Sequence, residues 1–165
     1  MNAIYANLIG YSFAVLIAHF PIARIQERLW NDLSSTACTD IRPRPWHATV
    51  IGVVERTLYV AALQASAAYL IGVWLALKAA SQWEGWSKGL QYSAVAAKNI
   101  TGRELANVFI TGTGVSLVFA LAGSRCIPHL IRAEWLKAVI FLVAPIIGAV
   151  LLYGFISRKT KERYP

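Results

Sequence analysis

Four long stretches of the sequence are almost continuously apolar, and polar or charged segments separate them. They run over residues 3–20, 50–77, 107–123 and 136–156. A helix that crosses a bilayer needs about 20 mostly apolar residues, and the four stretches are close to that length or longer. The runs are continuous rather than alternating, which excludes membrane-spanning strands. The pattern predicts an all-α membrane protein, a four-transmembrane-helix bundle formed by a single domain over residues 1–165.

The segment that follows the first stretch has a different pattern. The first stretch is expected to end at Pro21 and to be retained, because Met1-Asn2 carries no basic residue and no small-residue cleavage site follows. Between Arg24 and Asp32, apolar residues recur at positions 22, 25, 29 and 33, with charged residues on the other side. This is helical spacing, and it predicts an interfacial amphipathic helix after the first span.

The composition agrees with a membrane protein and excludes a soluble enzyme. Hydrophobic residues make up 57% of the chain and charged residues 15%, against about 25% charged residues in an ordinary soluble domain. The chain is basic, with 16 Lys and Arg residues against eight Asp and Glu residues and a net charge of +8. In membrane proteins, basic residues flank the spans and meet anionic lipid headgroups. We therefore expect the bilayer, and not nucleic acid, as the partner of these charges.

The orientation in the membrane follows less directly from the basic residues. Four spans would put both chain termini on one side of the membrane. The Lys and Arg residues then divide eight against eight: Arg24, Arg28, Arg42, Arg44, Arg56, Arg125, Arg132 and Lys137 on one side, and Lys78, Lys88, Lys98, Arg103, Arg158, Lys159, Lys161 and Arg163 on the other. The cluster at the C-terminal end is the densest, so the positive-inside rule predicts cytoplasmic termini.

The cysteine and histidine residues offer two candidate sites. Cys38 and Cys126 fall in connections that four spans would place on the same side, so a disulfide between them is a hypothesis if that side is extracytoplasmic. Cys126 and His129 have a spacing compatible with metal ligation, but no second pair accompanies them. Neither of the other histidines, His19 and His47, lies deep in a span, which excludes a haem with two axial histidines. No metal and no cofactor is expected.

Charged groups inside spans are the usual candidates for function, because each costs about 2.5 kcal/mol or more at mid-bilayer. Near one end of the second stretch lie Glu55 and Arg56, and Lys78 ends it. Helical spacing puts Glu55, Tyr59, Ala62, Ser66 and Tyr69 on one face, which should point into the bundle. Two interpretations are open: Glu55 is a proton or cation site, or it is a structural carboxylate paired with Arg56 or His19. The candidate functional polar residues are Glu55, Arg56, Tyr59, Ser66 and Lys78.

The third stretch carries small residues at four-residue spacing, at Gly112, Ser116 and Ala120. This small-xxx-small pattern is typical of helices that pack closely in membranes. A phosphate-binding glycine loop is the weaker interpretation, because the glycines lie within an apolar span and do not follow a strand. No arrangement of nucleophile and base and no cluster of carboxylates is found, so no catalytic residue is predicted.

Three short motifs lie within about residues 50–123, at Ile51–Arg56, Ile71–Lys78 and Gly112–Ser116. Together they match the pattern I-G-x-x-E-R … I-G-x-x-x-A-x-K … G-T-x-x-S. In this pattern the sequence resembles a family of small bacterial polytopic membrane proteins without an assigned activity. The resemblance implies a bacterial inner-membrane protein and adds no activity.

The sequence leaves more than one function open. The first hypothesis is a non-catalytic subunit or interaction module of a membrane complex or homo-oligomer, because the chain is small and has a small-residue face. The alternative is a small oligomeric transporter or channel that uses Glu55 as an intramembrane carboxylate. A transporter requires Glu55 to face a water-filled cavity lined by Tyr59 and Ser66.

Overall fold

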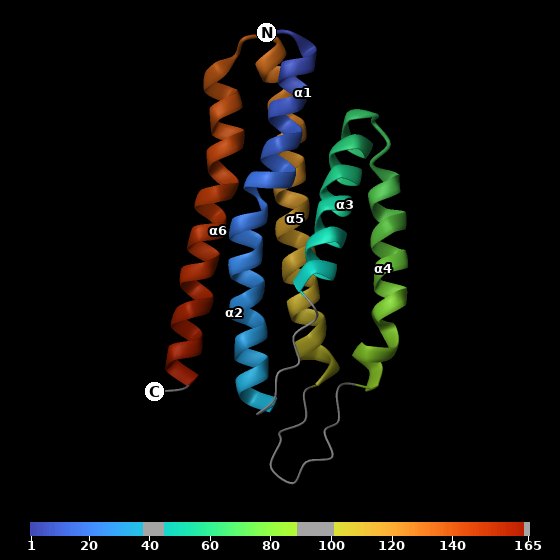
Figure 1. The fold of residues 1–165 in the computed structure, drawn as a ribbon, viewed down its shortest axis with the longest axis vertical. Helices are drawn as coiled ribbons and strands as arrows, with labels where there is room; N and C mark the ends of the chain where they lie inside the picture. The colour runs from blue at the N-terminus through green and yellow to red at the C-terminus, as the bar shows by residue number, and fades with distance from the viewer. Residues whose placement is uncertain (38–44, 89–100, 164–165) are drawn as a thin grey trace.

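The computed structural model describes residues 1–37, 45–88 and 101–163, and these residues form helices joined by short turns (Figure 1). The elements are α1 (Ala3–Ser12), the π-helix η1 (Phe13–Ile17), α2 (His19–Ala37), α3 (Pro45–Gln64), α4 (Tyr69–Lys88), α5 (Gly102–Ile131) and α6 (Trp135–Arg163). The central helix is α5, which contacts every other element. Three helices of the described chain are long and apolar enough to cross a membrane: Ala3–Ser35, Gly102–Ile131 and Trp135–Lys159.

The sequence pattern predicted that the first long helix ends at Pro21, but the helix continues through this residue. The elements α1, η1 and α2 follow one another along one line of the bundle (Figure 1). Pro21 has no N–H to donate to the carbonyl of Ile17, one turn earlier. The backbone before it widens into η1, where the amide of Ala18 donates to the carbonyl of Phe13 at 3.1 Å. Local π turns of this kind allow a membrane helix to continue through a proline.

The predicted interfacial helix over residues 24–32 is therefore part of α2 and is not separated from the first apolar helix. Its apolar spacing does describe which side packs, since Ile22, Ile25 and Leu33 are buried. These side chains face α5 and α6, the two helices on which α2 packs. The segment thus continues the bundle along its axis.

The second apolar stretch, residues 50–77, is not one helix, and this prediction was wrong. The chain turns back after Gln64, so that α3 and α4 form an antiparallel hairpin (Figure 1). Ser66 has φ 57°, in the left-handed region, and the amide of Ala67 donates to the carbonyl of Ala62 at 2.8 Å. These are the features of a Schellman motif, which ends a helix and satisfies its last carbonyls.

Ser66→Gly is expected to raise the free energy of unfolding by about 1 kcal/mol, because a residue with a Cβ atom costs that much in the left-handed region and glycine does not. Thermal unfolding of the purified protein in detergent measures the change. The matched control is Ala61→Gly, at an exposed position inside α3, which should lower stability by about 1 kcal/mol. Equal losses for both variants would contradict the turn at Ser66.

The same motif joins α5 to α6. Ala133 has φ 58°, and the amide of Glu134 donates to the carbonyl of His129 at 2.8 Å. The predicted third connection, around Cys126 to His129, is therefore the last part of α5, which continues through Pro128. The N terminus lies beside this turn and the C-terminal end of α6 lies at the other end of the bundle (Figure 1). The prediction that both termini lie on one side of the membrane depended on four spans. Because the second stretch is not one helix, that prediction loses its basis.

Candidate functional site

The hairpin of α3 and α4 carries the charged residues that the sequence singled out. Glu55 lies near the middle of α3, because this helix begins at Pro45 and not at the start of the apolar stretch. Its carboxylate is buried, with 3% of the residue exposed. Glu55 thus lies about ten residues from either end of α3, and not near a helix end.

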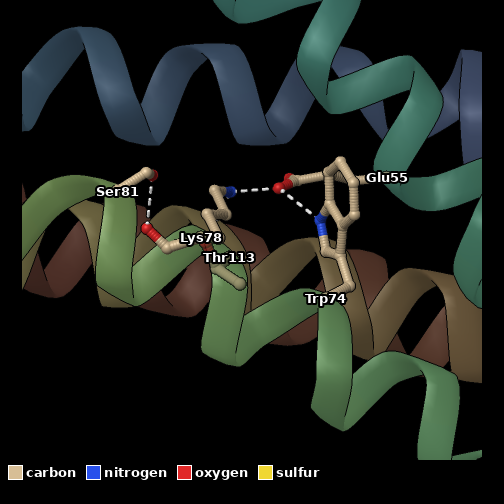
Figure 2. Close-up of polar contacts among 5 residues, drawn as sticks. All are labelled: Glu55, Trp74, Lys78, Ser81 and Thr113. Atoms are coloured by element: carbon tan, nitrogen blue, oxygen red, sulfur yellow. Dashed lines mark hydrogen bonds and ion pairs between the residues drawn. The ribbon is translucent and has the colours of Figure 1, made fainter.

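Glu55 is held from the neighbouring arm of the hairpin by two residues of α4. Lys78 forms an ion pair with its Oε1 atom, and the Trp74 indole Nε1–H donates to the same oxygen at 3.1 Å (Figure 2). The Lys78 ammonium also donates to Thr113 Oγ1 at 3.0 Å and lies 4.7 Å from the ring centroid of Phe109. Both of these partners belong to α5, so one lysine joins three helices.

This arrangement stabilises the contact of the hairpin with α5. A buried charge costs several kcal/mol unless it is paired and its remaining hydrogen-bonding groups are satisfied. Glu55 and Lys78 neutralise each other, and donors and acceptors from Trp74 and Thr113 complete the pair. In this arrangement the Glu55 carboxylate is almost fully buried, and its Oε1 atom is bonded to both Lys78 and Trp74.

Arg56, next in sequence, points toward the N-terminal helix and does not pair with Glu55. Its Nη2 atom donates to the carbonyl of Val15, within η1, at 3.4 Å. The residue is 2% exposed, and its Nε–H has no partner within the described chain. The guanidinium folds back over Gly52, where an added Cβ would lie 3.2 Å from Nη1. Arg56 thereby joins α3 to the widened turn of the first helix.

The predicted polar face of the second stretch is only partly formed. Tyr59 and Ala62 are buried on the same side of α3 as Glu55, and the Tyr59 hydroxyl has no hydrogen-bond partner in the part of the chain that the structure describes. Ser66 lies exposed in the turn, and Tyr69 is 71% exposed at the start of α4. The break after Gln64 separates these two residues from the face that continuous helical spacing assigned to them.

A polar contact that the sequence reasoning missed holds the tip of the hairpin. The side-chain amide of Gln64 donates to the carbonyl oxygen and to the hydroxyl of Ser124, both at 2.8 Å. The signal in the sequence was a lone glutamine within an apolar run, since such an amide needs a partner in lipid. Three polar anchors, at Gln64, Glu55 and Arg56, thus attach the hairpin to the rest of the bundle.

The small residues of α5 pack inside the molecule. Gly112, Ser116 and Ala120 are buried, and the Gln26 side chain of α2 occupies the space beside Gly112. A second row of small residues, missed in the sequence, faces α5 from the first helix. Its members are buried and lie four residues apart: Ala6, Gly10, Ala14 and Ala18. The small-residue face is therefore used within one chain, and it gives no support to a contact with another protein.

The cysteine and histidine candidates lie apart from this cluster. Cys126 is a buried free thiol in α5, whereas Cys38 lies outside the described residues, so the disulfide remains a hypothesis. His129 Nδ1 lies 2.7 Å from Glu134 Oε2. This contact and the hydrogen bond from Lys137 lower the pKa of Glu134 below its ordinary value. Within the described ranges, no group of three or more His, Cys, Asp or Glu residues could hold a metal ion.

Comparisons with known proteins do not identify the chain. No protein-family model, curated protein or solved structure matches it. The family resemblance over residues 50–123 therefore remains a prediction.

Proposed function

We propose that the protein is a polytopic inner-membrane protein with three membrane-crossing helices and one re-entrant hairpin. The three long apolar helices support the crossings. The break divides the second apolar stretch into two parts: 15 residues of α3, from Val50 to Gln64, and nine residues of α4, from Tyr69 to Leu77. Each arm is shorter than the roughly 20 residues that a crossing needs. A helical hairpin that enters and leaves on one side meets this constraint, because its backbone groups are hydrogen-bonded within the helices and in the turn at Ser66.

The basic residues support one orientation of this topology. Among the described residues, those at the C-terminal end of the bundle are Lys88, Arg103, Arg158, Lys159, Lys161 and Arg163, and those near the α5–α6 turn are Arg125, Arg132 and Lys137. By the positive-inside rule, the end with six basic residues faces the cytoplasm. The C terminus is then cytoplasmic and the N terminus is outside, where anionic headgroups of the inner leaflet meet the larger basic set.

We further propose that the protein acts as a non-catalytic subunit or interaction module, in a membrane complex or a homo-oligomer. The observation that carries this is that the Glu55 carboxylate is buried and bonded to Lys78 and Trp74. The charged groups in the middle of the bundle join helices to one another. What remains for contact with other molecules is the outer surface, where α4 and α6 expose large apolar side chains such as Val73, Leu77 and Val143.

The alternative function, a transporter or channel that uses Glu55, is less well supported by this geometry. Such a carboxylate must meet water or a substrate during the transport cycle. Here its charge is neutralised by Lys78, and Ser66, the expected lining residue, lies in the turn away from it. The geometry favours a structural carboxylate over a coupling carboxylate.

Site-specific cross-linking in native membranes tests the interaction module. A photo-reactive residue is placed at Val73 on α4 or at Val143 on α6, with buried Tyr59 as the matched control position. We expect one of the two outer positions to give a discrete product with a second copy or with one membrane protein at fixed stoichiometry, and the Tyr59 position to give none. Cross-links to lipid alone at both outer positions, with a monomer in lipid nanodiscs, would contradict the proposal.

A further inference from the structure

A depression lies between α2 and α6, on the outside of the bundle. It has a volume of about 200 Å³ and is lined by Pro21, Arg24, Ala149, Val150 and Tyr153. Pro21 and Arg24 are three residues apart on α2, so they share one face of that helix. Ala149 is buried where the two helices meet, and its small side chain leaves the space that its larger neighbours border. Pockets that enclose a whole small molecule hold about 300–1,000 Å³, so this one suits a segment of a longer ligand.

The walls of the depression combine a free cation with an apolar floor. Arg24 is exposed and makes neither a hydrogen bond nor an ion pair within the part of the chain that the structure describes. Tyr153 is 40% exposed and offers a hydroxyl on the opposite wall. Pro21, Ala149 and Val150 supply only apolar surface. A ligand that satisfies all of these groups has an anionic head and an apolar chain.

In the membrane placement proposed above, on which this inference rests, the depression lies at the boundary between the apolar core of the bilayer and its headgroup layer. Tyr153 precedes Arg158 by five residues, which is about 7 Å along a helix. An arginine at this depth on the lipid-facing surface is costly unless its long side chain reaches the headgroup layer. Tyrosine is enriched at the same level of membrane proteins. Lipid phosphate is the anion found at that level.

We propose that this depression binds one anionic phospholipid of the cytoplasmic leaflet. The Arg24 guanidinium donates to the phosphate, in the paired geometry that arginine forms with phosphate oxygens. The Tyr153 hydroxyl donates to the same headgroup, and an acyl chain lies along Pro21, Ala149 and Val150. A second copy of the chain is a poorer occupant, because two-fold contact at this surface would bring two Arg24 cations together.

Native mass spectrometry of the protein released from membranes tests the site, with phosphatidylglycerol and phosphatidylcholine as the competing lipids. We expect one retained lipid, with phosphatidylglycerol preferred. Arg24→Gln should reduce that preference about tenfold, because the arginine charge favours a lipid of net negative charge over a zwitterionic one, whose quaternary ammonium offsets its phosphate. Arg24→Lys should keep part of it. The matched control Arg103→Gln, an exposed arginine on α5 at the same end of the bundle, should leave it unchanged.

A second variant tests the apolar floor separately from the charge. Val150→Phe fills the depression from a position that is exposed in the chain, so the fold should persist, as monodispersity and helical circular dichroism can check. It should reduce retention of both lipids. An equal preference for phosphatidylglycerol in Arg24→Gln and Arg103→Gln would overturn the site, and so would displacement of the lipid by inorganic phosphate at equal concentration. Failure of the protein to fractionate with membranes would instead overturn the membrane placement itself.

Discussion

Lys78→Met should lower the free energy of unfolding by about 3–5 kcal/mol, the cost of leaving a buried charge without its counter-ion. Among the described residues, the Glu55 carboxylate of this variant keeps only the Trp74 indole as a donor, in a position that is 3% exposed. The variant also loses the hydrogen bond to Thr113 that attaches α4 to α5. Unfolding of the purified protein in mixed detergent, followed by helical circular dichroism, measures the loss.

The double variant Glu55→Gln/Lys78→Met separates the ion pair from ordinary packing. It removes both charges, so it should be more stable than Lys78→Met alone. Its loss should be smaller than the sum of the two single losses by about 1–3 kcal/mol, which is the coupling between the two positions. Glu55→Gln alone should cost less than Lys78→Met, because Lys78 is partly exposed and retains Thr113 and Phe109. Additive losses at the two positions would show that no ion pair stabilises the hairpin.

Gly123→Ala is the second substitution with a large expected effect, a loss of about 1–3 kcal/mol of unfolding free energy from overpacking. An added Cβ at Gly123 would lie 2.6 Å from the backbone oxygen of Gly10 and 3.1 Å from the Cβ of Ala14. Backbone atoms cannot rotate away as a flexible side chain can. The first helix would have to move off α5, and the tight packing along Ala6, Gly10, Ala14 and Ala18 would be lost with it.

The matched control for this substitution lies on the same helix. An added Cβ at Gly114 meets nothing within 4 Å, so Gly114→Ala should leave stability unchanged or raise it by up to about 1 kcal/mol through helix propensity. Both variants are compared in the same detergent unfolding assay. If Gly123→Ala proved as stable as Gly114→Ala, the close contact between the first helix and α5 would not exist in the folded protein.

The sequence predicted the helical class and the buried side of several helices, because apolar spacing records burial directly. Gly112, Ser116 and Ala120 lie in the core, and the apolar positions of α2 face its neighbours. The two turns were not predictable from local signals. Ser66 and Ala133 occupy the left-handed positions where glycine is usual, and neither a glycine nor a proline marks the break after Gln64. Pro21 was expected to end the first helix, but the π turn before it allows the helix to continue.

The candidate site could be predicted residue by residue but not as an arrangement. Glu55 and Lys78 each stood out as charges in an apolar run. In a continuous helix, their separation of 23 residues would place them about 35 Å apart. The turn at Ser66 brings them into contact, and only then do Trp74 and Thr113 become their partners. Pairing across a hairpin depends on the turn, which the apolar pattern does not encode.

Cysteine accessibility in sealed membrane vesicles tests the central claim, that the second apolar stretch is a hairpin and not a span. Single cysteines are introduced as His47→Cys at the start of α3, Ser87→Cys at the end of α4 and Ala133→Cys in the α5–α6 turn, in a chain whose own cysteines are replaced. We expect an impermeant thiol reagent to label His47→Cys and Ser87→Cys from the same, cytoplasmic side and Ala133→Cys from the other. Labelling of His47→Cys and Ser87→Cys from opposite sides would contradict it.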